Sequence, residues 1–306
     1  MSEIIHKPVL LKEVIGCLNL APGKNIIDAT IDGGGYAVAI LEKIAPEGLP
    51  AGEAGKLLGI EIDNTLIRGT ELRIKEAGFS KNAILMNDSY VNLKKICEEK
   101  KFEPDGIVFD LGLSSWHLEQ SKRGFSFKKD EILDMRFNPE TQPKTAAEII
   151  NQYGVEDLEK IFKEYGEEQF AESIAKAIVR ARKSKPIIRT QELVGVIEPA
   201  VPEWYKHRKI HCATKTFQAL RIEVNDELEN VRRGVSAAID VLKSKGRLAV
   251  VSFQGLEDKM VKEIFKEKTK EGIIKFVVKG TIKPTWNEQK ENPRSRSAKM
   301  KIVEKL

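Results

Sequence analysis

The sequence is poor in cysteine, glycine and proline, and it has no long apolar run. Three scattered cysteines, Cys17, Cys97 and Cys212, argue against a disulfide framework and for a reducing compartment. With 22 glycines and 12 prolines among 306 residues, the chain is neither collagen-like nor of low complexity. Its longest apolar stretches, such as residues 106–113, are far shorter than the roughly 20 residues of a membrane span. The amino terminus resembles neither a secretory nor a transit signal, so a cytoplasmic protein is expected.

The net charge and the spacing of possible metal ligands say little about partners or metals. Lys and Arg number 51 against 46 Asp and Glu, and this net charge of +5 permits a nucleic-acid partner without requiring one. His207, His211 and Cys212 lie close together in the sequence, but no fourth ligand follows at a spacing usual for zinc. We therefore expect no metal.

Short apolar runs alternate with helical patterns in the first third of the chain. Strands are expected at residues 25–28, 57–62, 83–86 and 106–111, and helices at 35–44, 65–77 and 90–100. The runs are rich in Ile, Leu and Val, as in strands that are buried on both faces. This order predicts a parallel, doubly wound sheet.

The alternation then stops and later returns. No strand is apparent from Trp116 to Ile210, and helices are expected at 145–152, 155–165, 167–183 and 190–200. Further helices are expected at 216–224, 227–242 and 259–268, strands at 248–252, 273–279 and 300–303, and a polar, basic loop at 283–296. The prediction is an α/β fold with seven strands. Residues 1–115 and 211–306 form the sheet domain, and 116–210 form an inserted all-helical domain.

Acids and glycines follow the first two predicted strands. Asp28 ends the first strand and leads into a loop with Gly33, Gly34 and Gly35, while Glu61 ends the second. The loop matches neither the dinucleotide-binding glycine pattern nor a phosphate-binding P-loop. An acid with glycines suits a ligand that carries an amine, such as S-adenosylmethionine, and Glu61 could accept ribose hydroxyls. A plain tight turn and a solvated strand end are the alternatives.

Polar residues also follow the third and fourth strands. Tyr90 could lie against an adenine, and Asp110 lies where a substrate would meet a methyl donor. The alternatives are a turn-stabilising carboxylate for Asp110 and a helix cap for Ser114 and Ser115. No serine-hydrolase pattern surrounds these serines, so they are not interpreted as nucleophiles.

Ordered motifs over nearly the whole length make the chain similar to the RsmH (MraW) family of rRNA cytosine-N(4) methyltransferases. The motifs are HKPVLL at 6–11, DLGLSS at 110–115, RGFSF at 123–127, LDMR at 133–136, YGEE at 165–168, TFQALRI at 216–222, SF at 252–253, LED at 256–258 and NPRSRS at 292–297. The resemblance implies a class I, Rossmann-like methyltransferase sheet with seven strands.

The resemblance also implies a reaction. The methyl donor would be S-adenosylmethionine, and the acceptor a cytidine in the decoding region of 16S rRNA, free or within the small ribosomal subunit. The cofactor contacts that it implies fall on Gly34, Gly35, Tyr36, Glu61, Tyr90, Asp110 and His117. Asp32, Tyr36, Trp116, His117 and Gln254 depart from the residues usual in the family.

For catalysis we expect in-line positioning of the cytosine amine, with Asp110 and the carbonyls of residues 111–113 accepting its hydrogens and Ser114 and Ser115 near the base. Candidate RNA contacts are Phe125, Phe127, Asp134, Arg136, Arg294 and Arg296, with core packing or an ion pair as alternatives. Further basic residues that together could bind phosphates are Arg180, Arg182, Lys183, Lys185, Arg189, Lys206, Arg208, Lys209, Lys215 and Lys299.

Three other interpretations remain. The chain could be an RNA-binding ribosome-assembly factor that has lost turnover. It could methylate another nucleic-acid amine, although the DLGL run replaces the turn typical of DNA amino-methyltransferases. A small-molecule methyltransferase would need neither the insertion nor the basic region near the carboxyl terminus. No membrane and no obligate metal are expected, and a homodimer is compatible with the sequence.

Overall fold

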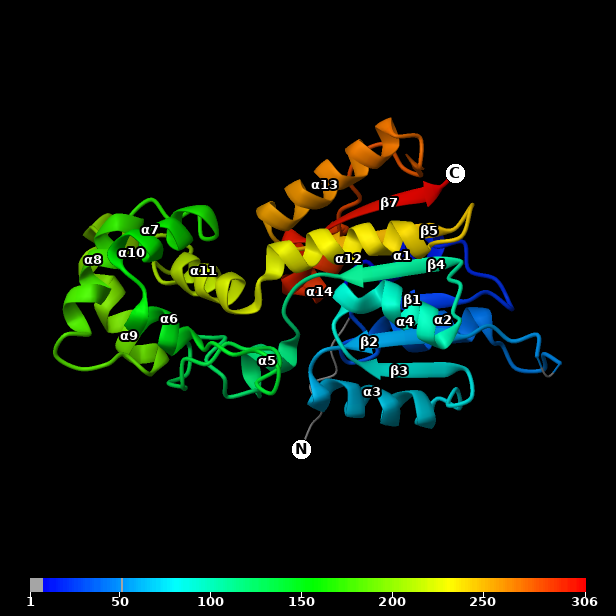
Figure 1. Ribbon diagram of the computed structural model, residues 1–306, viewed down its shortest axis with the longest axis horizontal. Coiled ribbons are helices and arrows are strands. Elements are labelled where there is room, and N and C mark those ends of the chain that lie inside the picture. Colours follow the sequence, from blue (N-terminus) through cyan, green and yellow to red (C-terminus); the bar gives the residue numbers. More distant parts are fainter. Residues whose placement is uncertain (1–7, 51) are drawn as a thin grey trace. The chain divides into compact units, whose positions relative to one another are not determined.

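The computed structural model describes residues 8–50 and 52–306, and the chain divides into two compact units (Figure 1). One unit contains the described residues up to Gly112 together with Leu228–Leu306, and the other contains Leu113–Glu227. The second unit includes the predicted insertion and extends beyond it, because helix α11 (Thr214–Asn225) packs against helices of the insertion. His6 and Lys7 of the first motif lie outside the described residues.

The first unit is built on a seven-stranded sheet with the order β3-β2-β1-β4-β5-β7-β6. The strands are β1 (Ile26–Asp28), β2 (Leu57–Glu61), β3 (Ala83–Asn87), β4 (Gly106–Asp110), β5 (Arg247–Ser252), β6 (Ile274–Phe276) and β7 (Lys299–Lys305). Strands β1 to β5 pair in parallel, whereas β7 lies antiparallel between β5 and β6. The predicted α/β class and the seven strands are confirmed. The antiparallel strand was not anticipated, because apolar runs carry no direction.

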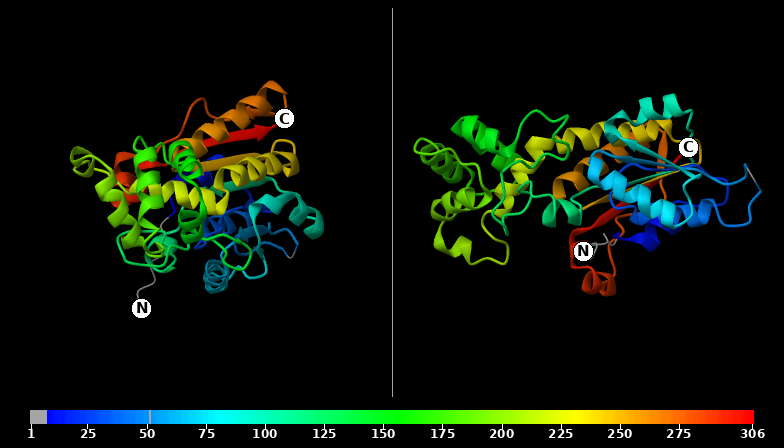
Figure 2. Two further views of the ribbon diagram at one scale, coloured as in Figure 1. Left: turned by 60° about the vertical axis from the view of Figure 1, so that its left-hand side comes forward. Right: turned by 90° about the horizontal axis from the view of Figure 1, so that it is seen from below.

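Helices cover both faces of this sheet (Figure 2). Apolar residues of α4, α12 and α13 pack on one face, and those of α1, α2 and α3 contribute to the core on the other. The helices of this unit include α1 (Leu11–Cys17), α2 (Gly35–Ile44), α3 (Asn64–Glu76), η1 (Tyr90–Asn92), α4 (Leu93–Lys100), α12 (Glu227–Val241) and α13 (Gly255–Lys270). Among the described residues, no helix has both the length and the apolarity to cross a bilayer.

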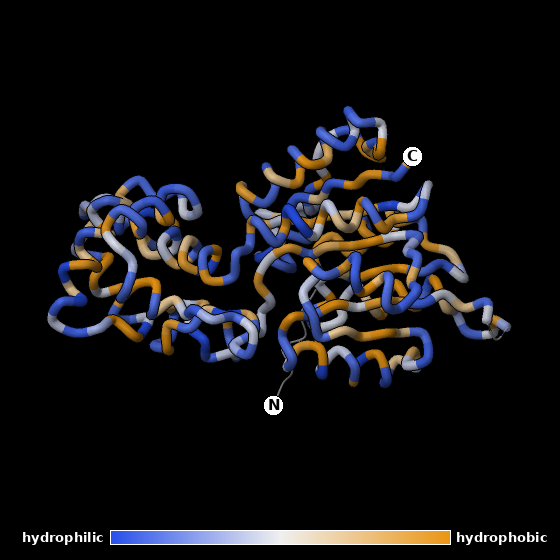
Figure 3. Tube along the Cα trace, in the orientation of Figure 1, coloured by the Kyte–Doolittle hydropathy of each residue, from blue (hydrophilic) through white to orange (hydrophobic). Residues whose placement is uncertain are grey.

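The sheet is buried because its central strands carry apolar residues on both sides, which Figure 3 shows as mostly orange strands. Every residue of β1 and β2 is buried, including the acids at their ends. Gly59 in β2 is required by this packing, because a Cβ there would lie 2.1 Å from Cδ1 of Ile31. The missing side chain lets the loop after β1 fold back over β2.

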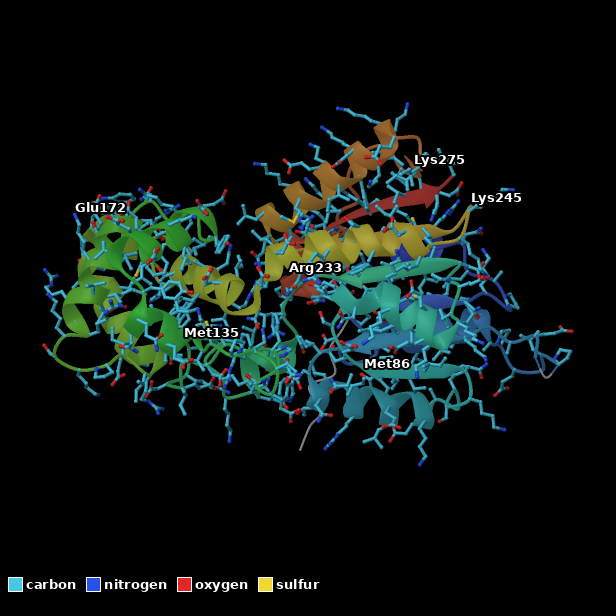
Figure 4. All side chains as sticks on the ribbon, in the orientation of Figure 1. Met86, Met135, Glu172, Arg233, Lys245 and Lys275 are labelled. Atoms are coloured by element: carbon cyan, nitrogen blue, oxygen red, sulfur yellow. The ribbon has the colours of Figure 1, made fainter. Side chains whose placement is uncertain are left out.

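The second unit is helical, with its own apolar core. Its helices are α5 (Ser115–Glu119), α6 (Ala146–Gln152), α7 (Val155–Glu164), α8 (Ala171–Ala181), α9 (Thr190–Ile197), η2 (Glu198–Ala200), α10 (Glu203–Lys206) and α11. Met135, labelled in Figure 4, is a fully buried member of the core. The predicted start of a helix at Glu167 was wrong. Glu167 has a left-handed φ of 49°, and the carboxylate of Glu168 accepts the Phe170 N–H (2.9 Å) before α8 begins.

The predicted loop at 283–296 was also wrong, because it contains α14 (Trp286–Glu291) and η3 (Pro293–Ser297). Thr285 caps α14 by accepting the N–H of Glu288 at 3.2 Å. The Glu288 carboxylate in turn accepts the N–H of Leu10 at 2.7 Å. Together, the cap and this distant contact order a stretch that looked like a polar loop.

Candidate active site

Three strands of the first unit end in carboxylic acids on one edge of the sheet. Asp28, Glu61 and Asp110 are the last residues of β1, β2 and β4, which pair in parallel with β1 in the middle. Because parallel strands bring their carboxyl ends to the same edge, the three acids share one rim. The structure therefore brings together two predicted site residues, Glu61 and Asp110, with an acid that the sequence analysis noted but did not include in the site.

Asp28 is fully buried at the centre of this rim. Its Oδ1 accepts the N–H of Thr30 at 3.4 Å, while its Oδ2 is buried and has no hydrogen-bond partner among the described residues. Burial, opposed by that hydrogen bond and reinforced by the nearby charge of Asp32, raises the pKa of Asp28 to about 7. A buried carboxylate oxygen without a partner favours a bound cationic or hydrogen-donating group.

Glu61 is held by two backbone donors. Its Oε2 accepts the N–H of Asp32 at 3.0 Å, and its Oε1 accepts the N–H of Asp63 at 2.9 Å. Burial and the neighbouring Asp32 raise the pKa of Glu61 to about 8 despite these hydrogen bonds. Asp63 has a different task, because it caps α3 by accepting the N–H groups of Thr65 (2.8 Å) and Leu66 (3.4 Å). Asp63 therefore serves the helix, and the assignment of Glu61 rather than Asp63 to a ligand stays a prediction.

Asp110 completes the cluster. Its backbone N–H donates to Oγ1 of Thr30 at 2.6 Å, which ties the end of β4 to the loop after β1. Burial raises the pKa of the Asp110 carboxyl well above its usual value, and the charges of Asp32, Asp28 and Glu257 raise it further.

Burial and the charge of Asp32 thus disfavour the ionised form of all three acids, and a positively charged ligand would favour it. S-adenosylmethionine carries a sulfonium and an amine, so the residues present fit this cofactor. Asp32 is the common neighbour, because it contributes to the raised pKa of Asp28, Glu61 and Asp110.

The glycine loop is shaped by a left-handed turn and by the amino-terminal segment. Gly34 has a φ of 73°, which a residue with a Cβ rarely adopts. A Cβ on Gly35 would lie 3.0 Å from the Pro8 ring. Tyr36, predicted as a cofactor contact, is buried, and its hydroxyl donates to the carbonyl of Val9. That hydroxyl therefore anchors the segment before α1.

Tyr90 follows β3 and packs beside the sheet. Its ring contacts Phe109 edge-to-face, with ring centroids 5.5 Å apart. A Cβ on Gly234 would lie 2.4 Å from the Tyr90 ring, so this glycine makes room for it. The ring is therefore held in one place, as a platform for a flat ligand group would need to be.

Other predicted site residues belong to the second unit. Ser114 is the N-cap of α5, where its Oγ accepts the N–H of Trp116 at 3.1 Å, as the helix-cap alternative expected. Ser115 and His117 are both buried. The His117 ring lies 5.1 Å from each of two aromatic rings, those of Phe125 and Phe137.

The candidate RNA contacts of the second unit have internal partners as well. Phe125 is part of the core of this unit, and Phe127 packs against the same core. Asp134 and Arg136 form a bidentate ion pair, with both N–O distances 2.8 Å. Burial acts to raise the pKa of Asp134, but the hydrogen bonds from Arg136 outweigh it and the pKa is lowered. The structure thus shows the ion pair that was the alternative to an RNA contact for Asp134 and Arg136.

Two features remain from the sequence-based expectations, the arginines near the carboxyl terminus and the histidine–cysteine cluster. Arg294 and Arg296 lie exposed on η3 in the first unit. In the second unit, the possible metal-ligand atoms of Glu198, His211 and Cys212 lie within 4.8 Å of one another. The sequence had grouped His211 and Cys212 with His207, but in the structure Glu198 is the third residue of this group. His207 lies 3.2 Å from the carboxylate of Glu203.

Asp28 was expected from the sequence to suit an amine-carrying ligand together with the glycine loop, but neither Asp28 nor Asp32 was named among the cofactor contacts. Both are next to this loop, and Asp28 is the last residue of a strand. The influence of Asp32 on the other acids could not be read from the sequence, because it depends on the left-handed backbone of this residue (φ 44°) and on its N–H bond to Glu61.

Comparisons with known proteins decide the family. The model of the MraW methylase family matches residues 3–306. The chain belongs to the MraW methylase family. It is 43% identical over 306 residues to the ribosomal RNA small subunit methyltransferase H of Dictyoglomus thermophilum, covering 99% of this chain and 97% of that one. The enzyme of the same name from Elusimicrobium minutum is 41% identical over 308 residues, covering 100% of each chain.

A solved rRNA methylase from Streptococcus thermophilus resembles the chain only weakly, with 11% identity and a TM-score of 0.44 over 97% of this chain and 92% of that one. The predicted family is confirmed by the sequence relationships. The MraW methylases are S-adenosylmethionine-dependent methyltransferases, so the predicted cofactor class is confirmed with the family.

Proposed function

We propose that this protein transfers a methyl group from S-adenosylmethionine to N(4) of a cytidine in the decoding region of 16S rRNA. The observation that carries the proposal is the carboxylate cluster of Asp28, Glu61 and Asp110 at one edge of the sheet in a member of the MraW methylase family. The relatives named as small-subunit rRNA methyltransferases, which span nearly the full chain, support the RNA substrate. A ribosomal substrate places the reaction in the cytoplasm.

The first unit would bind the donor. When bound, S-adenosylmethionine supplies an activated methyl group on a positively charged sulfur. Glu61 would accept the ribose hydroxyls through its carboxylate, which two backbone N–H groups already orient. Asp28 would offer its buried Oδ2 to a positively charged donor group. Gly34, Gly35 and Tyr36 shape the loop, and Tyr90 would support the adenine.

Asp110 is the proposed catalytic residue. The exocyclic amine of cytosine is a weak nucleophile, because its lone pair is delocalised into the ring. An ionised Asp110 that accepts an amine hydrogen would localise this lone pair and stabilise the positive charge that develops on nitrogen. The raised pKa of Asp110 means that its carboxylate ionises most readily when a positive charge lies nearby. We assign Ser114 and Ser115 to contacts near the base and His117 to a cofactor contact.

The second unit and the basic residues would recognise RNA, and we include Phe125, Phe127, Asp134, Arg136, Arg294 and Arg296 in this role. Since Phe125 is a core residue and Asp134 is paired with Arg136, these residues would act by shaping the unit as well as by touching RNA. The target base must leave its stack to be methylated, at a cost of a few kcal/mol if it is paired.

Nucleoside analysis after incubation with labelled donor tests the proposal. The substrates are small ribosomal subunits that lack the modification and naked small-subunit rRNA. We expect label in N(4)-methylcytidine from the wild-type protein and not from Asp110→Asn. Labelled N(4)-methylcytidine in neither substrate, with donor binding intact by calorimetry, would favour an assembly factor that has lost turnover. Label in a different nucleoside would contradict the cytosine assignment.

A further inference from the structure

The second unit exposes a tryptophan on a short helix that a basic segment follows. Trp204 of α10 retains 60% of its surface accessible to solvent, although large aromatic residues are usually covered. Its neighbours along the chain include Lys206, Arg208 and Lys209. An exposed aromatic beside basic residues is a combination that binds single-stranded nucleic acid.

Aromatic rings hold Trp204 in place. Its ring centroid lies 5.9 Å from that of Phe170 and 5.6 Å from that of Tyr205, both in edge contacts. Phe170 and Tyr205 also contact each other, with centroids 4.9 Å apart. The three rings therefore support one another, and Trp204 is the exposed member.

A buried carboxylate fixes the two supporting rings. Glu168 is only 2% exposed. Its carboxylate accepts the Tyr205 hydroxyl at 2.8 and 3.0 Å and the backbone N–H of Phe170 at 2.9 Å. Glu168 belongs to the YGEE motif, for which the proposed reaction provides no role. Because one acid holds the Tyr205 ring and the backbone of Phe170, Trp204 rests on a rigid base and would lose little conformational freedom on binding.

The positive charge next to the rings is available for phosphate. The guanidinium of Arg208 lies 5.0 Å from the centroid of the Tyr205 ring. Among the described residues, neither Arg208 nor Lys209 forms an ion pair, and both are exposed. Lys206 is paired with Glu203 at 2.8 Å.

Many of the other basic residues that the sequence suggested for phosphate binding are already engaged. Arg189 pairs with Asp130, Lys185 with Glu192 and Lys299 with Asp258. Arg182 and Lys215 donate to backbone carbonyls. Positive charge that is free to meet a phosphate backbone therefore remains beside Trp204.

We propose that Trp204 is a stacking platform for an unpaired base of the RNA substrate, with Arg208 and Lys209 binding the adjoining phosphates. This inference rests on the proposed function and deepens it, since it assigns one contact of the RNA. Stacking is tolerant of sequence, because every base has an aromatic face. The platform thus adds affinity for single-stranded RNA near the target, whatever the base.

Fluorescence anisotropy with a labelled single-stranded RNA of mixed sequence and with its duplex tests the platform. Trp204→Ala is expected to weaken binding of the single strand about ten- to a hundredfold and to leave duplex binding unchanged. Trp204→Phe, which keeps an aromatic face, should restore most of the affinity. Leu72→Ala is the control, because Leu72 is an exposed apolar residue (61%) on α3 in the other unit. Equal affinity of wild type and Trp204→Ala for the single strand overturns the proposal.

The salt dependence of binding tests the phosphate contacts. Arg208→Ala with Lys209→Ala should weaken single-strand and duplex binding alike, and should reduce the dependence of the logarithm of affinity on the logarithm of salt concentration by about 1 to 2. An unchanged salt dependence counts against this part.

Methyl transfer to ribosomal subunits separates this proposal from the function on which it rests. Trp204→Ala should raise KM for subunits and leave kcat and donor binding unchanged. If wild type transfers no methyl group but Trp204→Ala still loses single-stranded RNA, the proposed function fails and the platform stands. If wild type is active and Trp204→Ala has an unchanged KM, the platform fails. A loss of affinity for subunits alone, with naked RNA bound normally, means a protein partner and also overturns the proposal.

Discussion

The two units of this protein differ in how their buried and half-buried acids are paired. In the sheet unit, Asp28, Glu61 and Asp110 end neighbouring strands, and each has a raised pKa because of burial and the acids around it. In the helical unit, Asp134 is bound by Arg136, and Glu227 by Arg221 in a bidentate pair of 2.7 and 2.9 Å. The pKa of Asp134 is lowered accordingly.

The difference separates acids that serve the fold from acids that await a ligand. A carboxylate matched by an internal guanidinium leaves no lone charge in the fold, whereas removal of the guanidinium would create one. A cluster of carboxylates that oppose one another's charge is a cost to the ligand-free protein, and a positively charged ligand removes this cost. Three sets of variants and one pH dependence can break or sharpen the comparison.

The largest effect is expected at the end of β4. Asp110→Asn should lower the rate of methyl transfer at saturating donor about a hundredfold or more, because the amide cannot stabilise charge that forms on the cytosine nitrogen. Single-turnover kinetics measure this rate. The thermal midpoint should not fall, since the substitution removes a disfavoured charge from the cluster. Near-normal single-turnover activity of Asp110→Asn would exclude Asp110 from the catalytic role.

The next effect concerns an acid of the helical unit. Arg221→Met leaves Glu227, only 8% exposed, without its guanidinium, and should lower the free energy of unfolding by about 2 kcal/mol. Urea denaturation measures it. The double variant Arg221→Met with Glu227→Leu should recover most of the loss, because no lone charge remains. Arg232→Met breaks an exposed pair with Glu229 and should have no measurable effect. A similar loss in both single variants would contradict the distinction.

Glu61→Gln should weaken S-adenosylmethionine binding about tenfold, since a charge-assisted hydrogen bond to the ribose becomes a neutral one. Isothermal calorimetry gives the dissociation constant. The matched variant is Asp63→Asn, which retains a side chain able to cap α3. It should bind the donor within about twofold of wild type. Equal weakening by both variants would show that the rim, rather than Glu61 itself, was disturbed.

The smallest effect is the dependence on pH. The folded-state pKa values of about 7 for Asp28 and about 8 for Glu61 lie above the ordinary values of 3.8 and 4.5. The folded protein therefore holds protons that the unfolded chain releases, so stability without ligand should fall as the pH rises from about 4.5 to 8.

Donor binding favours the ionised acids, so it should release protons below about pH 8 and tighten as the pH rises towards this value. Thermal midpoints across this window and calorimetry in two buffers of different ionisation enthalpy measure the two trends. Glu61→Gln should flatten both. Proton uptake on donor binding would have the wrong sign for this account.

Much of the fold could be predicted from the sequence, because the patterns that predict helices and strands lie within short segments. Helix α2 begins at Gly35 and ends at Ile44 as the periodicity predicted, and Asp28 and Glu61 end neighbouring parallel strands as the apolar runs before them predicted. For Ser114 the sequence allowed two roles, a helix cap or a contact with the target base, and the structure shows the cap. The helix at Trp286–Glu291 was missed, since its order depends partly on a contact between Glu288 and Leu10.

In the candidate site, too, some features could be predicted from the sequence and others could not. Gly34, Glu61, Tyr90 and Asp110 could be named because each follows a recognisable strand. The sequence could not predict that the Tyr36 hydroxyl donates a hydrogen bond to the carbonyl of Val9.

The sequence by itself determined the α/β class, the seven strands, the methylase family and the acids that end the strands, because apolar periodicity and ordered motifs are properties of short segments. Only the tertiary structure decided which acids oppose one another and which are neutralised, and which aromatic rings support Trp204. Charge energies and ring contacts depend on distances of a few ångströms between residues that can be remote along the chain, and folding alone sets those distances.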